Sequence, residues 1–117
     1  MVKTYKKIVQ YIEKKRGPIA FFAVLTLDDL IASTAIVMAA DWVNKSNVFT
    51  QIDFLDDVLR KYLDNDELST IMETRILSTD SDELRPYRCY NTDERILDPH
   101  INGFDLLEGY VVYSRYK

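Results

Sequence analysis

The sequence predicts an α+β fold: a single domain over residues 1–117, with a mainly antiparallel sheet of four or five strands covered by two main helices. Apolar residues recur at helical spacing in residues 2–15 and 48–64, which indicates two amphipathic helices. Two apolar runs of strand length, residues 19–27 and 35–43, lie between these helices. Strands that are apolar on both sides are covered on both faces of their sheet, so we expect these two at its centre.

The connection between the two apolar runs decides how they pair. Residues 28–34 are too few for a helical crossover, and parallel neighbours in a sheet need such a crossover. We therefore expect the two central strands to be antiparallel.

The second predicted helix has the clearest apolar face in the chain. Its apolar side chains lie three or four residues apart for most of its length: Val48, Ile52, Leu55, Leu59, Tyr62 and Leu63. Three acidic residues, Asp53, Asp56 and Asp57, come early in this helix, whereas Arg60 and Lys61 come late. This order of charges complements the helix dipole.

The middle of the chain is more polar. We expect a short helical turn at residues 66–70 and a third strand at residues 71–78. Strand alternation divides that third strand into two faces, with Met72, Thr74 and Ile76 on one and Glu73, Arg75 and Leu77 on the other. Residues 79–95 are ambiguous between a short helix near residues 80–84, followed by a loop, and a loop throughout.

The end of the chain predicts a hairpin and a long last strand. Asn102-Gly103 is typical of a tight hairpin turn, because both residues tolerate positive φ. Residues 104–116 then form the last strand, with an expected bulge at Glu108-Gly109. Simple alternation puts Tyr110 and Tyr116 on one face of this strand and Tyr113 on the other.

The composition argues against most enzyme classes. The chain has one histidine (His100), one cysteine (Cys89) and three widely separated glycines. Most acid–base catalysis, zinc sites and nucleophile–base pairs need His or Cys with partners, and phosphate-binding loops need clustered glycines. We expect no catalytic residues, no metal site and no cofactor.

The charges bear on compartment and partners. Asp28 and Asp29 interrupt the apolar stretch at residues 17–40, which makes a membrane span too costly. A lone cysteine fits a reducing compartment, so we expect a cytoplasmic protein. Residues 1–16 hold six basic residues and one acidic residue in a chain of net charge −4. Basic helices can bind nucleic acid or membranes, but no nucleic-acid motif accompanies this one, so we expect a solvated helix.

The leading interpretation is a small non-catalytic protein that acts by protein–protein interaction, as a regulator, an adaptor or an immunity-type inhibitor of a basic partner. Ten acidic and three basic residues between residues 53 and 83 suit a basic partner. Two groups form the candidate interaction surface: Tyr110, Tyr113 and Tyr116, which suit interfaces, and Asp53, Asp56 and Asp57. If the last strand lies at a sheet edge, it could also pair with a second copy as a homodimer.

The alternative interpretation is a small-ligand-binding or metal-assisted hydrolytic domain. Its pocket would lie near Asp41 and Trp42, at the end of the second apolar run, with Glu73 and Arg75 of the third strand beside them. Asp41 with Glu73-x-Arg75 is only vaguely similar to the magnesium-binding pattern of restriction-endonuclease-type nucleases. The pattern departs from theirs because arginine stands where a tunable lysine amine is needed.

Overall fold

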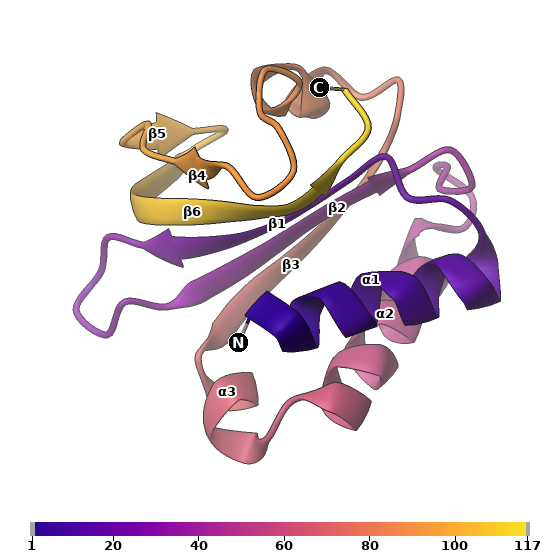
Figure 1. Ribbon diagram of the computed structural model, residues 1–117, viewed down its shortest axis with the longest axis horizontal. Coiled ribbons are helices and arrows are strands. Elements are labelled where there is room, and N and C mark those ends of the chain that lie inside the picture. Colours follow the sequence, from indigo (N-terminus) through magenta and orange to yellow (C-terminus); the bar gives the residue numbers. More distant parts are fainter. Residues whose placement is uncertain (1, 117) are drawn as a thin grey trace.

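The computed structural model, which describes residues 2–116, has two helices packed on one face of a curled sheet and an irregular layer on the other (Figure 1). The helical segments are α1 (Val2–Arg16), α2 (Val48–Tyr62), α3 (Asn65–Ser69) and the 3-10 helix η1 (Asp82–Tyr87). The strands are β1 (Phe21–Leu27), β2 (Thr34–Ala40), β3 (Ile71–Ser78), β4 (Arg95–Ile96), β5 (His100–Ile101) and β6 (Phe104–Ser114). The predicted α+β fold and its two main helices are confirmed.

The sheet has the strand order β3-β2-β1-β6-β4, and β5 pairs separately with β6. The central strands β1 and β2 are antiparallel, as their short connection predicted. β1 also pairs antiparallel with β6, whereas β2 and β3 are parallel. The parallel pair arises because the chain passes through α2 and α3 between these two strands, which returns it to the same end of the sheet.

The helical face of the sheet holds one half of the core. α1 buries Tyr5, Ile8, Val9 and Ile12, and α2 buries Leu55, Val58 and Leu59 against the sheet. These side chains meet Phe22, Ile36 and Met38, which project from β1 and β2 and have no exposed surface. The apolar stripes that predicted the two helices are therefore the faces that they bury.

The other face of the sheet is covered by residues 79–95, which the sequence left ambiguous, and by the residues that follow them as far as β5. η1, β4 and β5 supply Leu84, Tyr87, Ile96 and Ile101 to a second cluster over Ala23, Val37 and Ala39. Gly109 of β6 stands between its cross-strand neighbours Leu25 and Ile96. A Cβ atom there would lie 2.8 Å from Leu25 Cδ2 and 3.1 Å from Ile96 Cβ, so a larger residue would force these side chains to move.

Two irregularities in β6 change the faces of its tyrosines. The register with β1 shifts between Thr26 and Leu27 and again between Phe22 and Ala23, so Leu107 and Val112 are extra residues in β6. The first shift lies beside the expected bulge at residues 108–109. The second reverses the alternation after Val111, so Tyr110 and Tyr113 both pack on the helical face. Tyr116 packs on the other face. The prediction that Tyr110 and Tyr116 share one face, with Tyr113 on the other, is therefore wrong.

Leu55→Ala or Leu59→Ala should lower the free energy of unfolding by about 2–5 kcal/mol, because each removes a buried side chain from the helical core. Phe49 is on the same helix but is 79% exposed. Phe49→Ala is therefore the matched control and should stay within about 0.5 kcal/mol of wild type. Urea unfolding measures the free energy of unfolding of each variant. Equal unfolding midpoints for all three variants would contradict the assignment of the core face.

Candidate interaction surface

The last strand is not a free edge of the sheet. β6 lies between β1 and the segment that contains β4 and β5. On this outer side Val111 donates to the Glu94 carbonyl at 2.9 Å, Asp93 donates to the Val111 carbonyl at 2.7 Å, and Leu106 donates to the Pro99 carbonyl at 2.8 Å. These backbone groups of β6 are therefore used within the chain, and β6 is not the free edge through which a second copy was expected to pair.

The tyrosines of the last strand are used within the fold. The Tyr110 hydroxyl donates to Asp93 at 2.5 Å, and Asp93 pairs with Lys6 of α1 at 2.7 Å. The Lys6 ammonium and the Tyr110 hydroxyl lower the pKa of the Asp93 carboxyl, and the same carboxylate raises the pKa of Tyr110. Tyr113 and Tyr116 are half-buried against the two core clusters.

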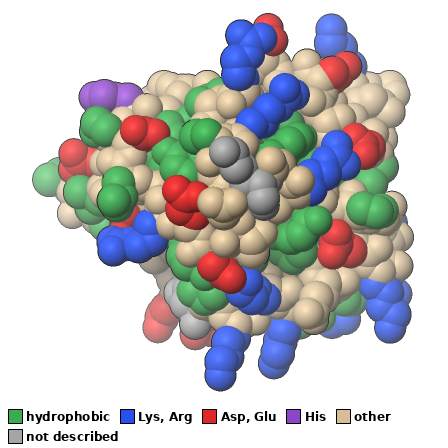
Figure 2. Space-filling view, turned by 45° about the horizontal axis from the view of Figure 1, so that its top comes forward, with side chains coloured by type: hydrophobic (Ala, Val, Ile, Leu, Met, Phe, Trp, Pro, Cys, Tyr) green, Lys and Arg blue, Asp and Glu red, His purple; other side chains and the backbone are tan. Residues whose placement is uncertain are grey.

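Part of the basic N-terminal helix also makes contacts within the chain. Besides the Lys6 ion pair, the Arg16 guanidinium stacks on the Phe54 ring of α2, 4.0 Å from its centroid. Lys61 of α2 lies over the Tyr11 ring of α1 at 4.5 Å. In the view of Figure 2, basic and acidic side chains are interspersed over most of the surface, and basic side chains gather along its lower edge. No helix in residues 2–116 combines the length and apolar character needed to cross a membrane.

Asp41 is held by a set of charged and polar contacts where β2 ends. The Arg115 guanidinium donates to both oxygens of its carboxylate, at 2.8 and 3.0 Å, and the Thr79 hydroxyl donates to Oδ1 at 2.7 Å. Arg115 and Thr79 lower the pKa of the Asp41 carboxyl to about 2. A carboxylate with these partners is a poor proton acceptor. The same contacts tie the end of β2 to the residues that follow β3 and β6.

The structure does not bring together the four residues of the alternative pocket. Trp42 donates its indole N–H to the carbonyls of Gly17 and Pro18, at 3.2 and 3.0 Å, and its ring packs against the turn between α1 and β1. Glu73 is paired in register with Ala35, five residues before the end of β3. Asp41 lies six residues after Ala35. Glu73 is therefore about 20 Å from the level of Asp41, at about 3.3 Å per residue.

A shallow hollow does lie beside Asp41. It has a volume of about 610 Å³ and is lined by Asp41, Asn44, Lys45 and Ser46 on one side and by Ser78, Thr79 and Asp80 on the other, with Val43 at its base. It opens at the carboxyl ends of the parallel strands β2 and β3. Within residues 2–116, no three His, Cys, Asp or Glu side chains are grouped so that they could hold a metal ion.

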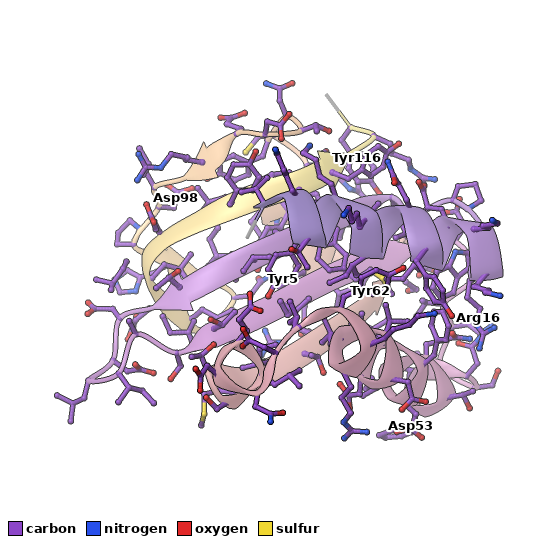
Figure 3. The ribbon with its side chains drawn as sticks, turned by 60° about the horizontal axis from the view of Figure 1, so that its bottom comes forward. Tyr5, Arg16, Asp53, Tyr62, Asp98 and Tyr116 are labelled. Atoms are coloured by element: carbon purple, nitrogen blue, oxygen red, sulfur yellow. The ribbon has the colours of Figure 1, made fainter. Side chains whose placement is uncertain are left out.

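The acidic residues of α2 lie on its outer surface. Asp53 and Asp57 are exposed, and Figure 3 shows Asp53 on the side of the helix that faces away from the sheet. Asp56 is half-buried, and burial together with the nearby Asp53 and Asp57 raises the pKa of its carboxyl although Arg60 opposes this. Asp57 has a loose ion pair with Arg60 at 3.6 Å, whereas neither Asp53 nor Asp56 has a basic group within 4.0 Å among residues 2–116.

Asp56 also lines a hollow between α2 and the start of β3. This hollow has a volume of about 310 Å³ and is lined by Asp56, Leu59, Arg60, Leu68 and Ile71. The opposite side of α2 faces α1, where Arg16 covers Phe54. Asp56 is therefore on the side of α2 that borders β3.

β3 is the open edge of the sheet. It pairs with β2 along one side, and no backbone hydrogen bond within residues 2–116 reaches its other side between Ile71 and Leu77. The strand contains no Pro or Lys, although Glu73, Arg75 and an extra residue at Met72 in its pairing with β2 moderate pairing at this edge. Met72 is 65% exposed. We define the α2–β3 surface as this edge together with Phe49, Asp53 and Asp56 of α2 and Met72 of β3.

Sequence reasoning missed the features that define this surface. Pattern alone could not show that β3 is an edge, because strand order depends on which strands the long α2–α3 connection brings together. One signal was present, since Glu73, Thr74 and Arg75 give β3 a polar centre where β1 and β2 are almost entirely apolar. The Asp41–Arg115 contact joins residues 74 positions apart and had no sequence signal.

No family model matches this chain, and searches of curated proteins and of solved structures found no match either.

Replacing Arg115 with Gln should raise the pKa of Asp41 from about 2 toward its ordinary value of 3.8, because the bidentate partner of the carboxylate is lost. The folded-state pKa is depressed, so the contact stabilises the fold above about pH 4 and this contribution disappears as the pH falls toward 2. Asp41 is 62% exposed, so the stabilisation is below about 1 kcal/mol.

The measurement is an NMR titration of the Asp41 side-chain carbonyl. Arg85→Gln, which removes the exposed partner of Asp82, is the control and should leave the Asp41 pKa unchanged. An Asp41 pKa close to 3.8 in the wild-type protein would contradict the contact.

Proposed function

We propose that this protein acts by binding another polypeptide chain at the α2–β3 surface, as a regulator, an adaptor or an immunity-type inhibitor, and not by catalysis. The observation that carries the proposal is the open edge of β3. An exposed strand edge presents unpaired N–H and C=O groups, and an extended segment of a partner can add to it as a further strand.

The side chains around this edge support the same function. Phe49 and Met72 are exposed apolar residues, and apolar residues at the centre of an interface exclude water from its hydrogen bonds. The hollow between α2 and β3 could receive one side chain of a bound segment. Because the Asp56 carboxylate lines this hollow, a basic side chain of the partner would fit it best.

The charges of α2 favour a basic partner. Asp53 and Asp56 have no basic group within 4.0 Å in residues 2–116, whereas Asp41, Asp93 and Glu108 are each paired within the fold. Unpaired carboxylates attract a basic partner during encounter and help to select it. The exposed thiol of Cys89 suits a reducing compartment, so we propose a cytoplasmic location.

The second candidate function is the binding of a small polar ligand in the hollow beside Asp41. Its support is the volume of about 610 Å³ and its position at the carboxyl ends of two parallel strands, where ligands commonly bind. It ranks second because the Asp41 carboxylate is already held by Arg115 and Thr79.

A synthetic peptide of alternating lysine and threonine tests the first proposal, since it is basic and suited to an extended strand. In an NMR titration it should shift the amide signals of β3 and α2. Asp53→Asn/Asp56→Asn should weaken binding by about 2- to 30-fold, since each exposed ion pair contributes about 0.2–1 kcal/mol. Added salt should also weaken the binding.

The matched control is Asp28→Asn/Glu83→Gln, which removes the same charge at exposed positions with no ion pair in residues 2–116. It should bind the peptide as the wild type does. Equal loss of affinity in both double variants, or shifts spread over the whole surface, would show that the peptide responds to net charge alone and would overturn the proposed site.

A further inference from the structure

We propose that the open edge of β3 pairs with the same edge of a second copy of this chain, so that two sheets join into one across a two-fold axis. This inference rests on the proposed function in that it assigns a partner to the same edge. A two-fold interface brings one surface patch against itself, so the patch must complement itself. β3 satisfies this condition through the order of its charges.

The two-fold axis allows only certain registers. Strands related by an axis perpendicular to the sheet are antiparallel, and each residue stands opposite one whose side chain is on the same face. The possible registers therefore differ in steps of two residues. In the register centred on Thr74, Glu73 stands opposite the partner's Arg75, and Arg75 stands opposite the partner's Glu73.

The neighbouring registers are disfavoured by charge. A slip in one direction places Glu73 opposite the partner's Glu73, and a slip in the other places Arg75 opposite the partner's Arg75. Like charges directly opposite each other destabilise a strand pair, whereas opposite charges stabilise it. The two charged residues of β3 thus favour the register centred on Thr74 over both of its neighbours.

One exposed apolar residue of β3 agrees with that register. Met72, which is 65% exposed, stands opposite the partner's Ile76. Ile71 adds no such pair, because β3 has an extra residue at Met72 in its pairing with β2, and Ile71 packs on the helical face whereas Leu77 packs on the other. Pairing would therefore cover Met72. Asp53 and Asp57, which are exposed on the outer side of α2, would remain accessible to a basic partner.

Both charged side chains already make contacts within one copy. Arg75 lies over the Phe104 ring at 4.3 Å and donates to the Asn102 carbonyl at 3.2 Å. Within one copy it pairs with Glu73 at 2.6 Å, and the Glu73 side chain is 44% exposed. In the paired state the two Glu73 and two Arg75 side chains would form one alternating network.

Charge exchange at these two positions tests the inference by sedimentation velocity over a concentration series. The wild type should associate reversibly into a dimer. Glu73→Arg and Arg75→Glu should each raise the dimer dissociation constant by about tenfold or more, since both cross-strand pairs become like-charge contacts. An equimolar mixture of these two variants should form a heterodimer, and the double exchange Glu73→Arg/Arg75→Glu should restore the homodimer.

The two rescue measurements separate loss of contact from loss of folding, because misfolded single variants would not recover on mixing. Arg85→Glu, at an exposed ion pair away from β3, is the control and should associate as the wild type does. A wild type that stays monomeric up to millimolar concentration overturns the inference. A dimer that none of the exchanges weakens, or single variants that the mixture and the double exchange fail to rescue, overturns it as well.

The outcomes for the inference and for the proposed function are distinguishable. A monomeric wild type whose β3 and α2 amides still respond to the lysine–threonine peptide retains the proposed function and loses the second copy as partner. A protein that dimerises and responds to the charge exchanges, but whose β3 and α2 amides do not respond to the peptide at concentrations well below the dimer dissociation constant, retains the inference and loses the basic partner.

Discussion

Side chains on both faces of β1 and β2 are removed from water, and this constraint organises the rest of the chain. Phe21, Phe22 and Met38 have no exposed surface, and Ala39 is equally buried. Burial of apolar surface is the main source of folding free energy, so each face of this central pair needs its own cover. α1 and α2 cover one face with long amphipathic helices. The residues between β3 and β6 cover the other.

The segments that cover the two faces of the sheet also decide which of its edges is hydrogen-bonded and which is open. β6 is tied on its outer side to residues 92–99, partly through the segment that covers the second face. Its two bulges let the strand curl while it keeps both sets of contacts. On the opposite side of the sheet, α2 and α3 lie over the face of β3, and no backbone group of residues 2–116 pairs with its outer edge. Helices thus protect the core there but not the edge.

The sequence predicted the elements that carry a strong local pattern. The apolar stripe of residues 48–64, the two apolar strands and the Asn102-Gly103 turn each have a period or a backbone requirement that is visible in the residues themselves. It could not predict strand order, because order depends on contacts between distant segments. For the same reason it placed β6 at a possible edge. The bulge at Val112, which reassigns the tyrosine faces, has no marker such as glycine.

Residue-resolved hydrogen exchange in the dilute, monomeric protein tests most directly whether β3 is the open edge and β6 is closed. Amides bonded across β1 and β2 should exchange only with global unfolding, and Val111, which donates to Glu94 on the outer side of β6, should also be protected. Alternate amides on the outer side of β3 should exchange at least about 100-fold faster. A Val111 amide that exchanges as fast as these, or a β3 that is protected at every residue, would contradict this account.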